Sequence, residues 1–108
     1  MTDKILVLST CGTPEEAERL GRQLIEKRLA ACVNVIPGAK SIYRWQGEIE
    51  DAPETLLLIK SRRSLFDAVR MELEKSHSYE VPEVVAVAIV EGSLGYLSWL
   101  EKELAPGA

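Results

Sequence analysis

The stretch CVNVIPGAKSIYRWQGEIEDAPETLLLIK, residues 32–60, holds two segments typical of β-strands with a turn between them. The turn falls at Gln46-Gly47, a dipeptide that suits the tight connection of a hairpin. Pro37-Gly38 interrupts the first segment, which indicates a bend or a bulge within a long strand. The stretch therefore predicts one extended antiparallel hairpin at the centre of the chain.

The sequence on either side of this hairpin predicts the remaining elements. Thr13 precedes a helix, because Pro14 suits the first helical position and Glu16, three residues after Thr13, completes a capping-box pattern. Similar signals predict a strand at 5–8, a helix from Ser64 to about Ser76, a strand at 84–90 and a helix capped by Ser93. This order is that of an α+β, ferredoxin-like βαββαβ fold with a long central hairpin and an extra C-terminal helix. We expect one domain over residues 1–104 and a disordered tail at 105–108.

Three of the expected strands are apolar at consecutive positions. In an antiparallel sheet with helices on one face, apolar and polar residues should alternate along each strand. Residues 5–8, 56–59 and 84–90 do not alternate, so both faces of the sheet need cover. One short C-terminal helix is too small for this task, and the same sheet of another subunit is the simplest cover. The pattern therefore predicts an obligate oligomer.

Composition and charge exclude several classes of protein. The 108 residues include 17 acidic and 13 basic side chains, giving a net charge of −4 with the single histidine neutral. Nucleic-acid binding needs a surplus of basic residues, and a membrane-spanning helix needs about 20 apolar residues in a row. The longest wholly apolar run covers only 84–90, and Cys11 and Cys32 form no CxxC motif. We expect a cytoplasmic protein whose partners include neither nucleic acid nor membrane.

Residues 75–83, KSHSYEVPE, concentrate side chains that could carry chemistry in a link between a helix and a strand. Such links carry function more often than the elements that they join. The simpler explanation of this segment is structural, with His77 as a favourable cation at a helix C-terminus and Tyr79 as a packing residue. Cys11 lies just before a helix N-terminus, which would lower the pKa of its thiol, so it is the better cysteine for metal or redox chemistry.

Other candidates have two possible roles. The aromatic pairs Tyr43 with Trp45, and Tyr96 with Trp99, suit packing or subunit contacts as well as a ligand platform. The acidic residues between 48 and 54 are typical of a solvated hairpin, although such carboxylates can also attract divalent cations. The chain contains no glycine-rich phosphate loop, no G-x-S-x-G elbow and no H-E-x-x-H pair. We therefore expect no enzymatic activity.

Three blocks of the sequence carry a resemblance to a known family. They are Ala31-Cys32-Val33-Asn34 with Pro37-Gly38, Ser41, Tyr43, Trp45, Gly47, Ile49-Glu50, Glu54 and Ile59-Lys60; His77 with Tyr79-Glu80-Val81-Pro82-Glu83; and Gly92 with Tyr96-Leu97 and Trp99. With these blocks the chain resembles the CutA divalent-cation tolerance proteins. Small departures occur at Ser61, Ser78 and Ala88, where other residues are usual in the family.

The resemblance implies a homotrimer similar in architecture to the PII signalling proteins, with clefts between subunits. In this sequence the cleft residues would be Tyr43, Trp45, Glu54, Lys60, His77, Tyr79, Glu83, Tyr96 and Trp99.

The resemblance also implies a role in metal-ion tolerance. Some members of the family bind copper through a first-strand cysteine, but that position is Ser9 here. His77 and Cys11 are therefore the best ligands for copper or another divalent cation.

Two alternatives to metal binding stay open. One is a PII-like signalling module that binds a small ligand in a cleft between subunits, lined by Lys60, Tyr79 and Glu83. The other is an enzyme with His77 as a general base, and no sequence motif supports it.

Overall fold

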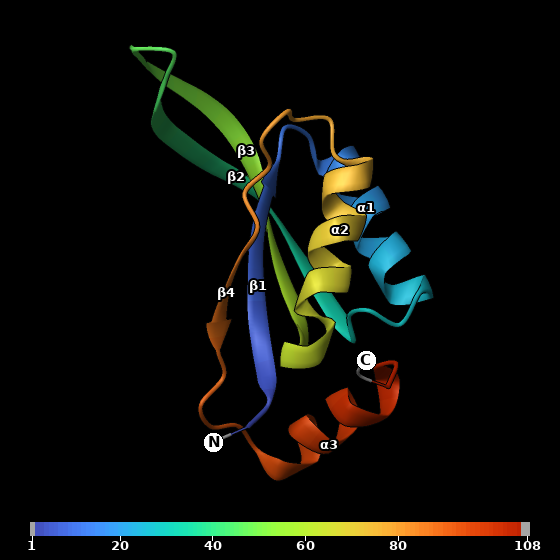
Figure 1. The fold of residues 1–108 in the computed structure, drawn as a ribbon. Helices are drawn as coiled ribbons and strands as arrows, with labels where there is room; N and C mark the ends of the chain where they lie inside the picture. Colours follow the sequence, from blue (N-terminus) through green and yellow to red (C-terminus); the bar gives the residue numbers. More distant parts are fainter. Residues whose placement is uncertain (1, 107–108) are drawn as a thin grey trace.

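The computed structural model describes residues 2–106 and confirms the mixed α+β architecture (Figure 1). In chain order the elements are β1 (Lys4–Cys11), α1 (Pro14–Glu26), β2 (Cys32–Trp45), β3 (Glu48–Arg62), a 3-10 turn (Arg63–Leu65), α2 (Phe66–Ser76), β4 (Val85–Ala88) and α3 (Leu94–Glu103). The strands form one antiparallel sheet in the order β2-β3-β1-β4. This topology is consistent with a ferredoxin-like fold.

Helices α1 and α2 pack against one face of the sheet and enclose the core. Residues at alternate positions of β1, among them Val7 and Cys11, point to this face and are fully buried. Leu57 and Ile59 of β3 lie beside them, and Leu24 of α1 covers them. Cys11 is thus a core residue at the end of β1, close to the start of α1.

The N-terminus of α1 is capped as the sequence predicts. The Thr13 hydroxyl accepts a hydrogen bond from the backbone N–H of Glu16 at 3.1 Å, and Pro14 occupies the first helical position. This cap holds the Glu16 side chain next to the end of β1, where it takes part in the site described below.

The central hairpin is confirmed and projects beyond the rest of the sheet (Figure 1). Gln46 and Gly47 have positive φ angles of 50° and 86°, as a tight hairpin turn requires. The register between β2 and β3 shifts between Ile36 and Ala39, so a bulge lies at Pro37-Gly38. Beyond this bulge, the outer half of the hairpin belongs to the site rather than to the core.

The second face of the sheet carries apolar residues that no helix of the described chain covers. Leu8 pairs with Leu58 and with Val85, and their side chains share this face. Val85 and Val87 of β4 are 49% and 50% exposed. Helix α3 lies across one end of the sheet near the N-terminus (Figure 1), where Glu101 pairs with Lys4. The two-sided apolar pattern is therefore present in the fold, while the oligomer itself stays a prediction.

Some predicted boundaries and caps are wrong. Ser64 does not cap α2, because it lies within the 3-10 turn and α2 begins at Phe66 without a side-chain cap. Ser93 precedes α3 but donates or accepts no capping hydrogen bond through its side chain. The last strand covers only Val85–Ala88 of the predicted 84–90, because its partner residues in β1 begin at Ile5.

The predicted tail at 105–108 is described only in part. The backbone N–H of Ala105 donates a hydrogen bond to the carbonyl of Arg28 at 2.8 Å, which ties the end of α3 to the segment after α1. Gly107 and Ala108 lie outside the described residues.

Candidate functional site

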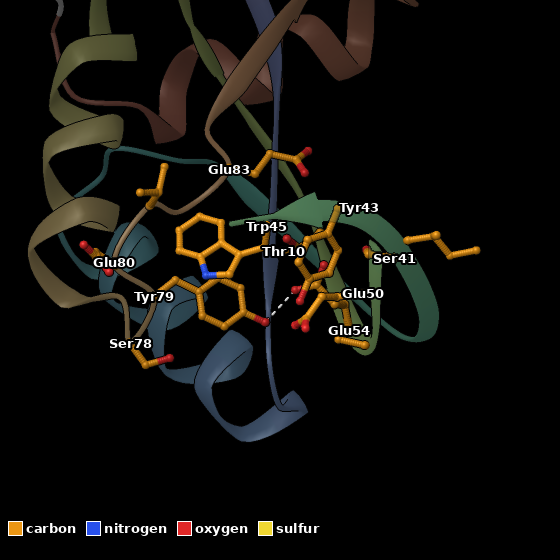
Figure 2. Close-up of a pocket in the computed structure, with 13 residues that line it drawn as sticks. Thr10, Ser41, Tyr43, Trp45, Glu50, Glu54, Ser78, Tyr79, Glu80 and Glu83 are labelled. Carbon is orange, nitrogen blue, oxygen red and sulfur yellow. Dashed lines mark hydrogen bonds between the residues drawn. The ribbon is translucent and has the colours of Figure 1, made fainter. Parts of the chain in front are cut away.

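A pocket of about 840 Å³ lies on the second face of the sheet, between the outer half of the hairpin and the link from α2 to β4 (Figure 2). The hairpin supplies two aromatic side chains and two carboxylates, β1 supplies Thr10, and the link supplies residues 78–81 and 83. The aromatic residues are Tyr43, Trp45 and Tyr79, and the carboxylates are Glu50, Glu54, Glu80 and Glu83. Figure 2 shows the three rings grouped around the same space.

A hydrogen bond joins the two sides of the pocket. The Tyr79 hydroxyl donates to Oε2 of Glu54 at 2.5 Å, and Glu54 is only 8% exposed. Burial, together with this bond to a carboxylate, raises the pKa of the Tyr79 phenol well above its usual value. The phenol therefore stays protonated and keeps the link docked on β3.

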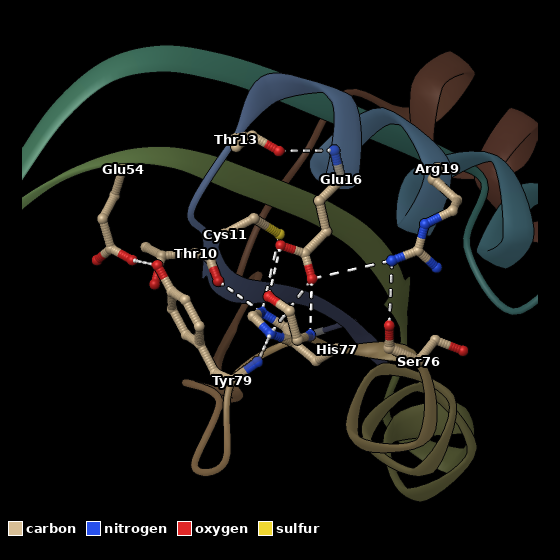
Figure 3. Close-up of polar contacts among 10 residues, drawn as sticks. Thr10, Cys11, Thr13, Glu16, Arg19, Glu54, Ser76, His77 and Tyr79 are labelled. Atoms are coloured by element: carbon tan, nitrogen blue, oxygen red, sulfur yellow. Dashed lines mark hydrogen bonds and ion pairs between the residues drawn. The ribbon is translucent and has the colours of Figure 1, made fainter.

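His77 lies immediately behind the pocket and is held by two backbone contacts (Figure 3). Its Nε2 is 2.7 Å from the carbonyl oxygen of Thr10, and its Nδ1 is 3.0 Å from the backbone N–H of Tyr79. A carbonyl can only accept, so Nε2 carries the proton, while Nδ1 accepts from Tyr79. The His77 side chain has no exposed surface. Because both ring nitrogens are engaged, the geometry does not present His77 as a general base to solvent.

Cys11 and His77 converge, although 66 positions separate them in the chain. The distance between Cys11 Sγ and His77 Nε2 is 3.8 Å. The prediction that the pKa of the Cys11 thiol is lowered is wrong, however. Burial, and then the nearby carboxylates of Glu16 and Glu54, raise this pKa to about 12. The helix N-terminus does not offset the loss of hydration, so Cys11 is a neutral thiol in this fold.

Glu16 fastens the link to α1. Its carboxylate accepts hydrogen bonds from the backbone N–H and from the hydroxyl of Ser78, at 2.7 and 2.9 Å, and lies 3.7 Å from Nδ1 of His77. Burial acts to raise the pKa of Glu16, but the two bonds from Ser78, together with the nearby His77 and Arg19 side chains, outweigh it, and the pKa is lowered. Figure 3 shows Arg19 bridging Glu16 and the carbonyl of Ser76.

The residues assigned to one cleft by resemblance fall into two groups in the chain. Tyr43, Trp45, Glu54, Tyr79 and Glu83 line the pocket, with His77 behind it.

Lys60, Tyr96 and Trp99 do not line the pocket. Lys60 pairs in register with Cys32, and its ammonium donates to Asn34 Oδ1 and contacts Cys32 Sγ. The ring centroids of Tyr96 and Trp99 lie 5.8 Å apart on α3, with the two ring planes tilted by 30°.

Two residues of the site carry no sequence signal for the role they have. Thr10 contributes its backbone carbonyl, which any residue could provide. Glu16 is part of a capping-box pattern, yet its carboxylate turns to Ser78 on a different element. Only the capping position of Glu16, beside the end of β1, could have suggested a contact with the link.

Two features are absent from residues 2–106. No group of three or more His, Cys, Asp or Glu side chains is arranged to hold a metal ion. None of the helices in this part of the chain combines the length and the apolar character that crossing a membrane requires.

Comparison with known proteins extends over nearly the whole chain. Residues 5–103 match the family model of the CutA1 divalent ion tolerance protein. The chain is 44% identical over 97 residues to "Protein CutA 1, chloroplastic" of Oryza sativa subsp. japonica, and 45% identical over 97 residues to the "Divalent-cation tolerance protein CutA" of Thermus thermophilus. Both alignments cover 90% of this chain, but they cover 55% of the rice protein and 94% of the Thermus protein. The chain thus spans about half the length of the rice relative.

The fold agrees with solved structures of these relatives. The crystal structure of CutA from Xylella fastidiosa matches with a TM-score of 0.93 at 42% sequence identity, covering 96% of this chain and 100% of that chain. Since sequence and fold agree from β1 to the end of α3, the chain belongs to the CutA1 divalent ion tolerance family.

Proposed function

We propose that this protein binds divalent cations, copper foremost, as a homotrimer, and that it acts by binding rather than by catalysis. The observation that carries the proposal is the approach of Cys11 Sγ to His77 Nε2 at 3.8 Å. A sulfur and an imidazole nitrogen from β1 and from the link after α2 are close enough to contact one ion. The names of the Thermus relative and of the family refer to divalent cations, in agreement with the proposal.

The donor set fits copper better than zinc. Thiolate sulfur and imidazole nitrogen are ligands that copper accepts, whereas a structural zinc ion takes four Cys or His ligands. The described chain offers only Cys11 and His77 at this place. Copper held there would supply a Lewis acid, and the pair would supply its first two ligands.

Both donors are engaged in this fold, which sets a condition on binding. Nε2 of His77 would have to release the Thr10 carbonyl and give up its proton to Nδ1, which would end the hydrogen bond from the Tyr79 N–H. The Cys11 thiol would also have to lose its proton. The link that carries His77 has no strand or helix between Ser76 and Val85, so it can open without breaking the sheet. We therefore expect copper binding to be slow and to loosen the contact between the link and β1.

The trimer is supported by the uncovered face of the sheet. Leu6, Leu8 and Leu58 are only partly buried there, and Val85 and Val87 are half exposed. A continuous apolar surface of this kind, exposed to water, is unusual for a stable monomer. The same face of neighbouring subunits would bury it.

A cytoplasmic location is part of the proposal. Cys11 and Cys32 are both free thiols, as a reducing compartment allows. The name of the rice relative refers to the chloroplast, and it describes that protein alone.

A second candidate function is a PII-like module that binds a small ligand. The pocket of about 840 Å³ favours it, because this volume lies within the range of small-molecule sites, roughly 300–1,000 Å³.

Calorimetric titration of the metal-stripped protein with copper, zinc and magnesium tests the metal proposal. We expect about one copper per chain, with binding lost in Cys11→Ser and in His77→Gln. Cys32→Ser is the matched control, because it removes the other free thiol and should leave binding intact. No heat with any of the ions, or equal loss in Cys32→Ser, would contradict the proposal.

Light scattering after gel filtration tests the trimer. A chain of 12.0 kDa should elute with a mass of about 36 kDa. Val87→Glu on the open face should lower the mass toward 12 kDa, whereas Leu94→Glu, at an 81% exposed position of α3, should not. A wild-type mass near 12 kDa would refute the trimer.

A further inference from the structure

We propose that Glu16 is the positioning residue of His77: its carboxylate accepts a hydrogen bond from Nδ1 of His77 in the tautomer whose Nε2 is free to bind copper. The inference rests on the proposed function, to which it adds the residue that holds the histidine in its binding form. The contacts involved lie beside α1, which packs on the opposite face of the sheet from the one that the trimer would bury (Figure 1).

The fold holds His77 in a tautomer that cannot bind a metal ion next to Cys11. Nε2 donates its proton to the Thr10 carbonyl at 2.7 Å, and Nδ1 accepts from the backbone N–H of Tyr79 at 3.0 Å. Nε2 is also the ring nitrogen that lies 3.8 Å from Cys11 Sγ. A ring nitrogen that carries a proton has no electron pair to offer a metal ion. Nε2 can therefore become a ligand only if the proton moves to Nδ1.

A proton on Nδ1 needs an acceptor that the protein must supply. The present partner of Nδ1 is the backbone N–H of Tyr79, which is a donor and cannot accept. The His77 side chain has no exposed surface, so solvent does not reach the ring. A buried N–H group without a partner is costly. The binding tautomer is therefore favourable only if an acceptor lies beside Nδ1.

Glu16 lies in the position of this acceptor. Its Oε2 is 3.7 Å from Nδ1 of His77 (Figure 3). This separation exceeds a hydrogen bond because Nδ1 is itself an acceptor here, and two acceptors do not bond to each other. Once Nδ1 carries the proton, a shift of roughly 0.5–1 Å brings the two atoms within hydrogen-bond range. Metal-binding histidines commonly donate their other ring N–H to a carboxylate, which fixes the tautomer and the ring orientation.

Glu16 can accept this bond and keep those that it already has. Its two oxygens accept from the backbone N–H and from the hydroxyl of Ser78, one bond each. A carboxylate offers about four acceptor positions, so room is left for Nδ1. Arg19 approaches Oε2 at 3.9 Å from the other side and keeps the carboxylate in place. Because Ser78 follows His77 directly, Glu16 continues to hold the link after the Tyr79 N–H has left Nδ1.

Nitrogen-15 NMR of the imidazole in the full-length protein tests the inference without relying on affinity. Copper(I) is the probe, because it has a closed electron shell and leaves the thiol reduced. The chain contains a single histidine, so every ring signal belongs to His77. We expect Nε2–H in the metal-free protein and Nδ1–H in the copper(I)-loaded protein, with the Nδ1 proton shifted downfield and slow to exchange. In Glu16→Ala this proton should lose the downfield shift and exchange faster, which a mere loss of folding stability would not produce.

Affinity gives the second readout, in a copper(I) competition titration against a chromophoric chelator without oxygen. Glu16→Ala should raise the Kd about tenfold, the lower end of the losses seen when the hydrogen-bond partner of a metal ligand is removed. Glu16→Gln should raise it only about threefold, because it keeps a neutral acceptor and a neutral bond is roughly half as strong as a charge-assisted one. Glu18→Ala is the matched control: it removes an exposed carboxylate of the same helix that pairs with Arg22 and should leave the Kd unchanged.

The outcomes separate this inference from the proposed function. Copper(I) binding by the wild type with an unchanged Kd in Glu16→Ala, or with Nε2–H retained in the loaded protein, would overturn the inference and leave the proposed function standing. If Glu16→Ala does not fold, a Kd and an Nδ1 resonance in Glu16→Gln equal to those of the wild type would overturn it. An equal loss in Glu18→Ala would do the same, because net charge would then be the cause. If the wild type takes up no copper(I), the proposed function and the inference fall together.

Discussion

Replacement of Tyr79 by phenylalanine tests how the link between α2 and β4 is held on the sheet. The substitution removes only the hydroxyl that donates to Glu54 at 2.5 Å and leaves the ring in place. A hydrogen bond to a charged group is worth about 1.5–3 kcal/mol. Tyr79 is only partly buried, so water can replace part of the bond, and we expect a loss at the lower end, about 1.5–2 kcal/mol.

A double-mutant cycle with Glu54→Gln isolates the bond. Glutamine still offers an acceptor to the Tyr79 hydroxyl but removes the buried charge, so the bond becomes a neutral one. Tyr79→Phe should therefore cost less in the Glu54→Gln background, and we expect a coupling free energy of about 1 kcal/mol. Tyr43→Phe is the matched control, since the Tyr43 hydroxyl makes no hydrogen bond within the described chain, and its cost should stay below about 0.5 kcal/mol.

Urea unfolding at one fixed chain concentration is the appropriate assay. The concentration must not vary, because the stability of an oligomer depends on it. A loss of about 1.5–2 kcal/mol corresponds to a midpoint about 1 M lower for an m value near 2 kcal/mol/M. If Tyr79→Phe unfolds at the same urea concentration as Tyr43→Phe, or if the coupling is zero, the bond does not hold the link and the reasoning is refuted.

Three further predictions concern stability away from the pocket. Gly95→Ala in α3 should raise the free energy of unfolding by up to about 1 kcal/mol, because alanine favours a helix and its Cβ meets no atom within 4 Å; a lower urea midpoint would contradict this. Thr13→Ala should cost about 1 kcal/mol by removing the cap of α1, whereas Ser93→Ala should change the same midpoint little, since its side chain caps nothing. Glu101→Gln should be less stable than the wild type at pH 7, because the hydrogen bond from Lys4 lowers the pKa of Glu101 in the folded state. This difference should shrink as the pH falls below 4.5, the ordinary pKa of a glutamate, because the stabilisation is lost as the lowered pKa is passed. A constant difference in melts recorded from pH 7 to pH 3 would refute the assignment.

Much of the fold follows from local sequence patterns. The turn at Gln46-Gly47, the bulge at Pro37-Gly38 and the Thr13 cap depend on backbone angles and hydrogen bonds within a few residues, which residue type alone can indicate. The start of α2 was less predictable. Serine is a residue type that commonly caps helices, but at Ser64 the chain turns through a 3-10 segment that leads from β3 into the helix.

The candidate site was predictable in its members more than in its arrangement. His77, Tyr79 and Glu54 are candidates because of their residue types, and Cys11 is a candidate because it lies just before a helix. Their contacts join residues 25 to 67 positions apart, so they depend on strand register and on the path of the link. Local pattern carries no information of this kind.

Sequence by itself determined the order of the elements, the long hairpin and the presence of apolar residues on both faces of the sheet. These features follow from local propensity and from the period-two alternation of strands. Only the tertiary structure decided that Cys11 is a neutral thiol beside His77 and that Glu54 is a buried carboxylate open to a pocket. The physical reason is that burial and pairing set the charge state of a side chain, and both depend on residues that only folding brings together.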